Sequence, residues 1–485
     1  MKSTRFDAFS IFLIALIMRL LFSFYFQQFY FGDFIFKYAD TSSYLNPILN
    51  LINNGEYIGD KYLTDSRYFR PPVYPLFLGL FHLISPESFF DYIVASVQCL
   101  LGASSSVLIY CCILNITGMR RAAQLSSFIF ATYPFAILWV PIMYTETLQL
   151  FCILLLVFLA SARNITVISV ILQGILVGLI VLTKQYLGLI ILIPIYIIVL
   201  TARLTLQQKI AHLFIFIFSF SLMISPWVIR NYIASGKIIV LFSKTAGLRF
   251  TLNDMIAFTH FANKFDENII ENVNLVAYTG KISLSKHHEF VTKHKKDIDD
   301  AALLAHQCGG SFQEWRKQSS LEQPPYQNCN DSVASKFNLL SDKFWREVPF
   351  WEALESRRDS IWKIVSKSDL VNKSLSLNKN SMLKYSLFKY RVILIFLGLA
   401  GIIYLLMQKN KKHQQRVIVE SLIFTAIVFY SFFCLIMVQA EMRYLLTPDV
   451  LITIFAGVIP AALVAKISRQ RRPKAVLTPI DKSNV

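Results

Sequence analysis

The sequence predicts an all-α polytopic membrane protein with about ten transmembrane helices, and three observations lead to this fold class. Hydrophobic residues make up 55% of the 485 residues and charged residues only 16%, whereas soluble domains carry about 25% charged residues. The mean hydropathy is +0.50. Apolar runs of about 20 residues, long enough to cross the hydrocarbon core, recur along the chain and alternate with short basic clusters.

The first apolar run, residues 6–26, follows Lys2 and Arg5 and resembles a signal peptide. It is longer than a typical signal sequence and has no small-residue cleavage site, so it is interpreted as a retained first span. Residues 72–85 are apolar but short, which favours an interfacial or half-inserted helix in the first external loop. The nine further spans are predicted at residues 91–117, 122–140, 146–160, 165–182, 186–200, 210–228, 392–407, 417–438 and 446–465.

The charge distribution sets the predicted topology. Basic residues cluster at alternate span ends, and ten crossings place both termini on the cytoplasmic side. The net charge of +18 could indicate a nucleic-acid partner, but much of the excess lies in short loops and in the tail, as the positive-inside rule expects. No RNA- or DNA-binding signature occurs, so no nucleic-acid partner is predicted.

Four regions follow from the composition. Residues 1–232 form an N-terminal transmembrane module whose external loop, 28–72, holds the candidate site. Residues 233–389 form a water-facing insertion, mostly helical, because charged and polar residues replace the long apolar runs there. Residues 390–467 hold the C-terminal transmembrane helices, and 468–485 form a basic cytoplasmic tail.

Two features of the insertion remain open at this level. Its only cysteines, Cys308 and Cys329, could form a disulfide in an exported domain, but the sequence does not fix the geometry that a disulfide requires. Residues 331–365 read as amphipathic helix with large aromatic residues among charges. Such a segment packs either on the core of its own domain or on the membrane surface.

The predicted topology places the polar motifs at the span ends on one side, the external face. These residues are Asp40, Arg70, Glu146, Lys184, Arg230, Glu441 and Arg443. A carboxylate whose pKa is raised by partial burial suits general-base chemistry, while arginine and lysine suit the binding of phosphate oxygens. The co-location predicts one active site for chemistry on a membrane-borne phosphate.

Each acid also has a structural interpretation. Asp40 precedes Thr-Ser-Ser and a helical pattern, so it could simply cap a helix. Glu146 could begin a span, where an acid is favoured by the helix dipole. An acid between two apolar spans is costly, however, and this cost favours a functional role for Glu146.

The cations are also open to two interpretations. Arg70 and Arg443 could be interfacial anchors, because cations at span ends often extend toward the lipid headgroups. Lys184 and Arg230 run against the positive-inside bias, which favours function. The histidines have no metal-ligand spacing and no Gly-rich phosphate loop occurs, so neither a metal nor a nucleotide site is indicated, although a divalent ion is not excluded.

The motifs at these positions, taken in order, resemble the GT-C glycosyltransferases. The similarity is to bacterial relatives of the dolichyl-phosphate-mannose protein mannosyltransferases (glycosyltransferase family 39) and to aminoarabinose transferases. It covers residues 1–232 and 392–465. The motifs are Ala39-Asp40 with Tyr44-Leu45, Gly55 and Tyr57, Arg70-Pro71-Pro72-Val73-Tyr74-Pro75, Tyr144-Thr145-Glu146-Thr147, Pro226-Trp227-Val228-Ile229-Arg230-Asn231-Tyr232 and Glu441-Met442-Arg443-Tyr444.

The resemblance implies roles for these residues. Asp40 and Glu146 would be the catalytic or substrate-organising acids, with no cofactor. Four cations would bind the donor phosphate: Arg70, Lys184, Arg230 and Arg443. Three tyrosines would contact substrate: Tyr74, Tyr144 and Tyr444. The long insertion after Tyr232 departs from close relatives and leaves the acceptor open.

The function implied is inverting transfer of a hexose or pentose from a polyprenyl-phosphate-linked donor to a lipid, glycan or protein. The reaction would take place at the external, periplasmic face of a bacterial inner membrane, with membrane lipids as further partners. One alternative is an O-antigen ligase or polymerase, which takes a diphosphate-linked glycan. The other is a lipid or solute transporter, which the gathering of charges at span ends disfavours, because transporters need ionisable groups near the middle of the membrane.

Overall fold

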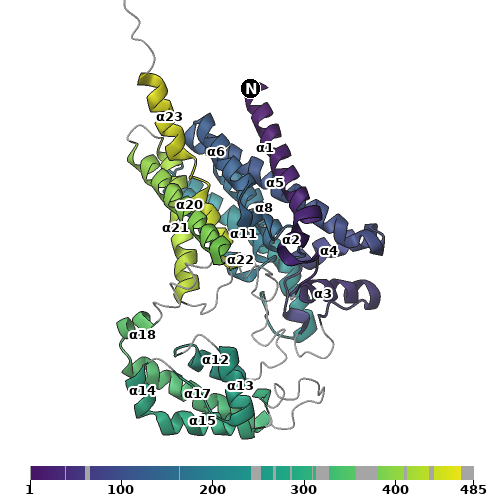
Figure 1. Ribbon diagram of the computed structural model, residues 1–485, viewed down its shortest axis with the longest axis vertical. Helices are drawn as coiled ribbons and strands as arrows, with labels where there is room; N and C mark the ends of the chain where they lie inside the picture. Colours follow the sequence, from purple (N-terminus) through teal and green to yellow (C-terminus); the bar gives the residue numbers. More distant parts are fainter. Residues whose placement is uncertain are drawn as a thin grey trace, which may run out of the picture.

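The computed structural model describes residues 2–38, 40–59, 66–162, 164–241, 253–265, 269–284, 287–308, 310–312, 327–356, 381–408, 412–435 and 442–470. Within these residues the chain is helical and contains no strand. A long helical bundle stands above a separate group of helices, α12 to α18, and the N-terminus lies at the end of the bundle away from that group (Figure 1). Each part has its own hydrophobic core.

Among the described residues, six helices are long and apolar enough to cross a membrane: Thr4–Phe31, Glu87–Thr117, Leu206–Ser235, Tyr385–Met407, His413–Cys434 and Met442–Ser468. Four shorter apolar helices accompany them: Val73–Ile84, Glu146–Ala160, Val167–Val181 and Gln185–Leu200. The predicted fold class, an all-α polytopic membrane bundle, is confirmed. The chain is a multi-pass membrane protein.

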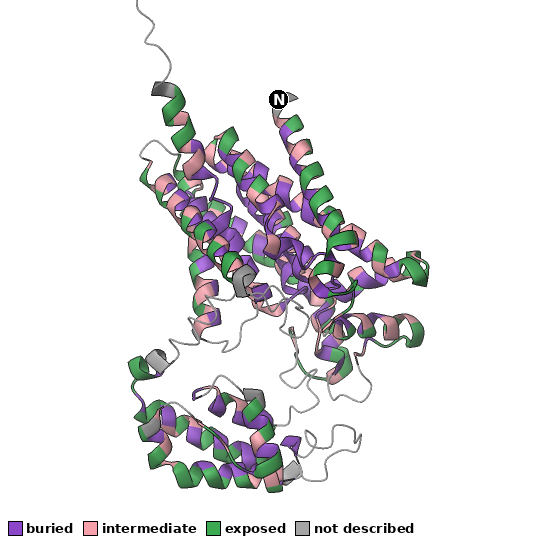
Figure 2. Ribbon diagram, in the orientation of Figure 1, coloured by how far each residue is buried: buried purple, intermediate pink, exposed green. Residues whose placement is uncertain are grey.

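The outer helices of the bundle present apolar side chains outward. Figure 2 shows exposed residues along α1 (Lys2–Leu21) and buried residues toward the centre of the bundle. Phe9 on α1 is 64% exposed, and Phe214 on α11 (Leu206–Ser235) is 70% exposed. Such side chains suit contact with lipid tails, because the bilayer offers them an apolar solvent.

Most predicted spans correspond to helices whose bounds differ by a few residues. The first span is α1 followed by a π-helical turn, Phe22–Phe26, and α2 (Gln27–Phe31). Span eight begins earlier than predicted, because α20 runs over Ser381–Met407. The other helices of the bundle are α3 (Thr41–Asn54), α4 (Val73–Ile84), α5 (Phe90–Thr117), α9 (Val167–Val181) and α21 (His413–Leu435).

Three predicted spans are interrupted rather than continuous. The span predicted at 122–140 is α6 (Arg120–Ala131) and one turn, α7 (Pro134–Ile137), followed by a non-helical segment up to α8 (Glu146–Ala160). Pro134 explains the first break, since proline has no N–H to continue the helix. The span predicted at 186–200 is a 3₁₀ helix, η4 (Gln185–Ile191), followed by α10 (Leu192–Leu200). The span predicted at 446–465 consists of two helices, α22 (Met442–Thr453) and α23 (Val458–Gln470).

The separate helical group falls within the predicted insertion. Its helices are α12 (Asn253–Ala262), α13 (Ile269–Thr279), α14 (His288–Lys293), α15 (Lys295–Gln307), α17 (Gln327–Glu347) and α18 (Phe350–Ser356). A core of aromatic residues holds them together, with Phe258 in edge contact with both Phe312 and Phe337. Of the predicted amphipathic segment, Phe337, Leu340 and Phe344 pack into this core. The first alternative is therefore correct for α17, whereas Trp345 and Trp351 are exposed.

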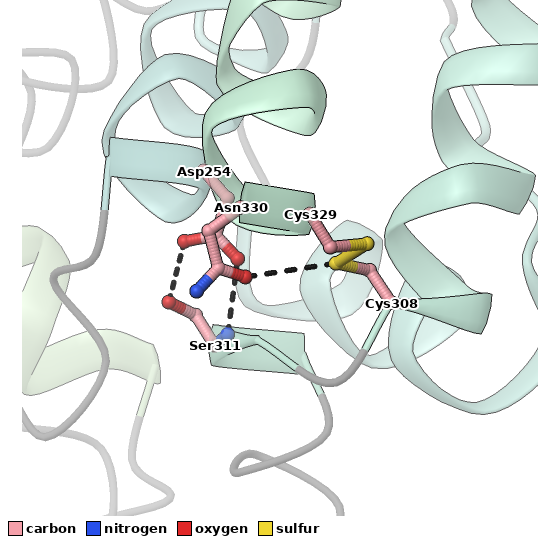
Figure 3. Close-up of a disulfide and its surroundings, with 5 residues drawn as sticks. All are labelled: Asp254, Cys308, Ser311, Cys329 and Asn330. Carbon is pink, nitrogen blue, oxygen red and sulfur yellow. Dashed lines mark hydrogen bonds between the residues drawn. A yellow bond between two sulfur atoms is a disulfide. The ribbon is translucent and has the colours of Figure 1, made fainter. Parts of the chain in front are cut away.

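The cysteine pair left open by the sequence is a disulfide. Cys308 and Cys329 are bonded, and they join the end of α15 to the first turn of α17 across 21 positions of sequence. Figure 3 shows Asn330 beside the disulfide and Asp254 facing Ser311, whose N–H and hydroxyl donate to the Asp254 carboxylate at 3.0 and 2.6 Å. The disulfide thus lies beside a hydrogen-bonded junction between α12 and the segment after α15.

Removing this disulfide is expected to destabilise the separate helical group, α12 to α18, by about 3 kcal/mol, because the open chain regains the entropy of a loop of this length. The change is Cys308→Ser with Cys329→Ser, and the measurement is the denaturant midpoint of the full-length protein in detergent. Reduction of the parent protein should give the same midpoint as the double variant. An unchanged midpoint would show that the bond adds no stability.

Several predicted features lie outside the described residues. These are Glu441 of the late motif, residues 357–365 of the amphipathic segment, and residues 471–485 of the basic tail.

Candidate active site

Asp40 lies at the N-terminal end of α3, where the sequence left a choice between a helix cap and a functional acid. It occupies the cap position, but its side chain makes no capping hydrogen bond. Its Oδ2 instead accepts a hydrogen bond from Arg443 Nη2 at 2.9 Å, and its Oδ1 lies 3.4 Å from Arg70 Nη2. The carboxylate therefore binds two guanidinium groups that are far apart in the sequence.

Arg70 is held in place from several sides. Its Nε donates to Ser43 Oγ at 2.8 Å, and its guanidinium lies over the rings of Tyr44 and Phe69 at 4.2 and 4.3 Å. Cation–π contacts of this kind restrict the orientation of the guanidinium plane. The Arg70 side chain is 15% exposed and that of Asp40 is 36% exposed, so a ligand can reach this pair.

Arg443 lies at the centre of the site, in the first turn of α22. It binds Asp40, and its Nε lies 3.9 Å from Glu146 Oε1. The guanidinium lies over the ring of Tyr144 at 4.9 Å and over that of Tyr444 at 5.1 Å. Its side chain is only 7% exposed. Arg443 therefore joins the two predicted acids into one cluster.

Glu146 and Lys184 form the buried end of the cluster. Lys184 Nζ lies 2.9 Å from Glu146 Oε1, and the two side chains are 8% and 1% exposed. The ammonium also lies 4.8 Å from the centre of the Tyr444 ring. Breaks in the helices bring these residues together, since Glu146 follows the non-helical segment after α7 and Lys184 lies between α9 and η4.

Of the three predicted tyrosines, two contact the cluster directly. Tyr144 accepts a hydrogen bond from the Asp40 N–H at 3.3 Å and donates its own hydroxyl to the Tyr38 carbonyl at 2.9 Å. The Tyr444 hydroxyl accepts from Arg443 Nη2 at 3.2 Å. The hydroxyl of the third tyrosine, Tyr74, instead donates to Gln98 Oε1 at 3.1 Å.

Arg230 does not join the cluster. Its two Nη atoms donate to the backbone carbonyls of Arg67 and Tyr57, each at 2.8 Å. The Tyr57 hydroxyl in turn donates to the Arg70 carbonyl at 2.9 Å. Arg230 thus ties α11 to the segment between α3 and α4 that presents Arg70, and it reaches the site only through that segment.

The electrostatics of Asp40 differ from the expected raised pKa. Burial raises the pKa of this carboxyl, but the Arg70 and Arg443 guanidiniums, with a smaller contribution from Lys184, outweigh burial and hold the pKa below its ordinary value of 3.8. Asp40 is therefore ionised at neutral pH. The cluster brings three cations, Arg70, Lys184 and Arg443, around two carboxylates. One net positive charge remains for an anionic ligand.

Across the described part of the chain, no three His, Cys, Asp or Glu side chains come together as a group able to hold a metal ion. The expectation that the protein needs no cofactor stays a prediction.

The sequence analysis missed a second buried ion pair. Arg391 and Asp449 are both fully buried within helices of the bundle, as is Arg19 on α1. The expectation that the charges gather at span ends was therefore incomplete. The available signal was an acid or a base inside an apolar segment, which is costly in a membrane and indicates a partner.

The fold and this cluster define a polytopic helical membrane protein with an acid–cation site at one end of its bundle. The family model for dolichyl-phosphate-mannose-protein mannosyltransferases matches residues 69–229. The predicted resemblance to the GT-C glycosyltransferases is thereby confirmed over this part of the chain. The match includes Arg70, Glu146 and Lys184, whereas Asp40 and Arg443 lie outside it. No curated protein sequence matches the chain.

Several solved structures are similar. An oligosaccharyltransferase, AglB from Archaeoglobus fulgidus, in complex with an inhibitory peptide and a dolichol-phosphate, is 14% identical with a TM-score of 0.49. The match covers 96% of this chain and 51% of that one, so the present chain spans about half the length of that enzyme. ArnT from Cupriavidus metallidurans, bound to undecaprenyl phosphate, is 13% identical with a TM-score of 0.35, and the match covers 97% of this chain and 80% of that one.

Proposed function

We propose that this protein is a membrane glycosyltransferase that transfers a sugar from a polyprenyl-phosphate-linked donor to an acceptor at the external face of the membrane. The single observation that carries the proposal is the cluster of Arg70, Lys184 and Arg443 around Asp40 and Glu146. Cations in excess over acids suit a phosphate, and arginine offers a planar fork to its oxygens. The family match over residues 69–229 supports the same class.

In the proposed reaction, Arg70 and Arg443 bind the donor phosphate and stabilise the negative charge that develops on it as the bond from C1 of the sugar breaks. Asp40 accepts the proton of the attacking acceptor hydroxyl or orients that hydroxyl. Attack from the face opposite the phosphate inverts the anomeric centre. Glu146 holds Lys184 and Arg443 in position from the buried side of the site.

The proposal is tested by reconstituting the protein in liposomes with labelled polyprenyl-phosphate hexoses and pentoses. Release of the polyprenyl phosphate with transfer of the label supports the proposal, and mass spectrometry of cell-surface glycans and lipids with and without the gene identifies the acceptor. Turnover of diphosphate-linked glycans alone would assign the protein to the ligase or polymerase class. Transport of the intact labelled lipid across the bilayer without cleavage would contradict the proposal.

Arg230→Lys is expected to lower the turnover number about tenfold, because the two carbonyls are bound by two separate nitrogens of a planar guanidinium, and a single ammonium nitrogen does not match that geometry. The loop that carries Arg70 would loosen, so the expected change includes faster tryptic cleavage of that loop. Arg67→Lys is the matched control, since the Arg67 side chain is largely exposed and pairs with the exposed Glu56. Equal effects of the two substitutions would contradict this role for Arg230.

A further inference from the structure

The second buried ion pair lies on the helix that carries Arg443. Arg391 of α20 donates from Nε to Asp449 Oδ2 at 2.6 Å and from Nη2 to Oδ1 at 3.1 Å, and both side chains are 0% exposed. The Tyr430 hydroxyl of α21 also donates to the Asp449 carboxylate. One carboxylate on α22 is therefore bound from both neighbouring helices.

Helix association alone does not explain this pair. Replacing a buried ion pair by apolar residues of similar volume is often neutral or stabilising, so such a pair is weak evidence for a contribution to stability. Close packing already joins α20 to the chain that follows Asp449. A Cβ atom added at Gly398 or Gly401 would lie 2.4 Å from the carbonyl oxygen of Ile452 or Phe455. Packing therefore already holds the two helices together, and the ion pair in addition restricts their relative orientation.

The position of Asp449 on α22 indicates which part of that helix the ion pair orients. Asp449 follows Arg443 by six residues on the same helix, a rise of about 9 Å, and Pro448 lies between them. Proline has no N–H to bond the carbonyl of Tyr444, so the helix is less constrained in this turn. The orientation of the first turn, which carries Arg443, therefore depends on how the helix is held just after the proline.

The ion pair also borders the other segment that builds the site. Tyr133, at the break between α6 and α7, is 1% exposed, and the centre of its ring lies 6.3 Å from that of Tyr390, the residue before Arg391. The chain that continues from this break supplies Tyr144 and Glu146 to the site. The buried pair therefore lies beside α22, which carries Arg443, and also beside the start of the segment that supplies Tyr144 and Glu146.

We propose that Arg391 and Asp449 are positioning residues, which orient α22 so that Arg443 reaches Asp40 and Glu146. The inference deepens the proposed function and rests on it for the identity of the ligand, the donor phosphate. The pair itself does not touch the substrate. It acts through Arg443.

The test removes both charges at once, with Arg391→Met and Asp449→Leu, so that no buried charge loses its partner. Reconstituted protein is titrated with undecaprenyl phosphate. At least tenfold weaker binding is expected, while the protein still unfolds in one cooperative thermal transition. In the Arg443→Ala background, the same double substitution should cause no further loss of binding. Undiminished binding in the double variant, or an equal further loss in the Arg443→Ala background, would overturn the proposal.

A second readout does not need the ligand. A double-mutant cycle on thermal midpoints compares Arg443→Ala in the parent and in the double variant. If the pair positions Arg443, the loss caused by Arg443→Ala should be smaller in the double variant, because Arg443 no longer makes its ion pairs there. Equal losses of thermal midpoint in the two backgrounds would overturn the inference. Failure of the parent protein to bind undecaprenyl phosphate in the titration would count against the proposed function alone.

The matched control removes an ion pair at the other end of the bundle. Arg120 Nε and Nη2 donate to the Asp7 carboxylate at 2.5 and 2.7 Å and tie α6 to α1. Asp7→Asn with Arg120→Met should leave both the binding and the midpoint loss caused by Arg443→Ala unchanged. A tenfold loss of binding in this control would contradict the specific link between the Asp449 pair and Arg443.

Discussion

Asp40→Asn is expected to lower sugar transfer by about 1000-fold while the protein still inserts and folds, because general-base catalysis contributes factors of this order. The substitution also removes the charge that holds Arg70 and Arg443 together. The measurement is the initial rate of label transfer from the reconstituted enzyme, with insertion checked by the yield of monodisperse protein.

The matched control is Glu56→Gln, which neutralises an exposed carboxylate just after α3, the helix that Asp40 precedes. It is expected to change the rate less than twofold, since exposed ion pairs contribute little. If Asp40→Asn retains the parent rate, Asp40 is neither the base nor the residue that orients the acceptor.

The pH dependence follows from the lowered pKa of Asp40. Because the folded-state pKa lies below 3.8, the ion pairs of Asp40 stabilise the fold above that value and are lost as the pH falls through the lower folded-state pKa. No change in rate from this group is therefore expected between about pH 5 and neutrality. A rate that falls on acidification near pH 6 in the parent but not in Asp40→Asn would contradict the lowered pKa.

Glu146→Gln is expected to destabilise the protein by about 3–5 kcal/mol, because it leaves Lys184 buried without its carboxylate. Both side chains are almost completely buried, and Arg443 also loses its second acid. Transfer should fall as well, since three cations then compete for the single charge of Asp40. The measurement is the denaturant midpoint of detergent-solubilised protein.

A double variant separates stability from activity. Glu146→Gln with Lys184→Met removes the unpaired ammonium, so most of the stability should return while transfer stays low. If Glu146→Gln alone keeps the parent midpoint, the pair does not support the fold. If the double variant regains activity, the pair has no part in the reaction.

The bundle was largely predictable because membrane insertion is a local property of the chain. A run of about 20 apolar residues specifies a helix in lipid, since every backbone group must be satisfied within the segment. The breaks at Thr132–Tyr133 and at residues 454–457 were not predicted. Their polar backbone groups are tolerated because neighbouring helices bury them, and hydropathy does not report those neighbours.

The site, like the bundle, was predictable from the sequence only in part. The acids and cations were found one by one, because charged residues are rare next to apolar spans. Their pairing was not predictable, since Asp40 and Arg443 are separated by nearly the whole chain. Asp40 has a residue type suited to a cap, but in the fold its carboxylate binds two guanidiniums instead. Arg230 has the expected charge, and only the fold shows that it binds the backbone of the segment between α3 and α4.

The sequence by itself determined that this is a multi-pass helical membrane protein that resembles the dolichyl-phosphate-mannose-protein mannosyltransferases over residues 69–229. It also identified the residues that form the acid–cation cluster. The tertiary structure decided which of those residues meet, that Arg443 joins Asp40 to Glu146, and that Arg391 of α20 pairs with Asp449 of α22. The reason is physical: burial and helical periodicity are local, whereas an ion pair in a low-dielectric interior depends on long-range packing that brings its partners within about 3 Å.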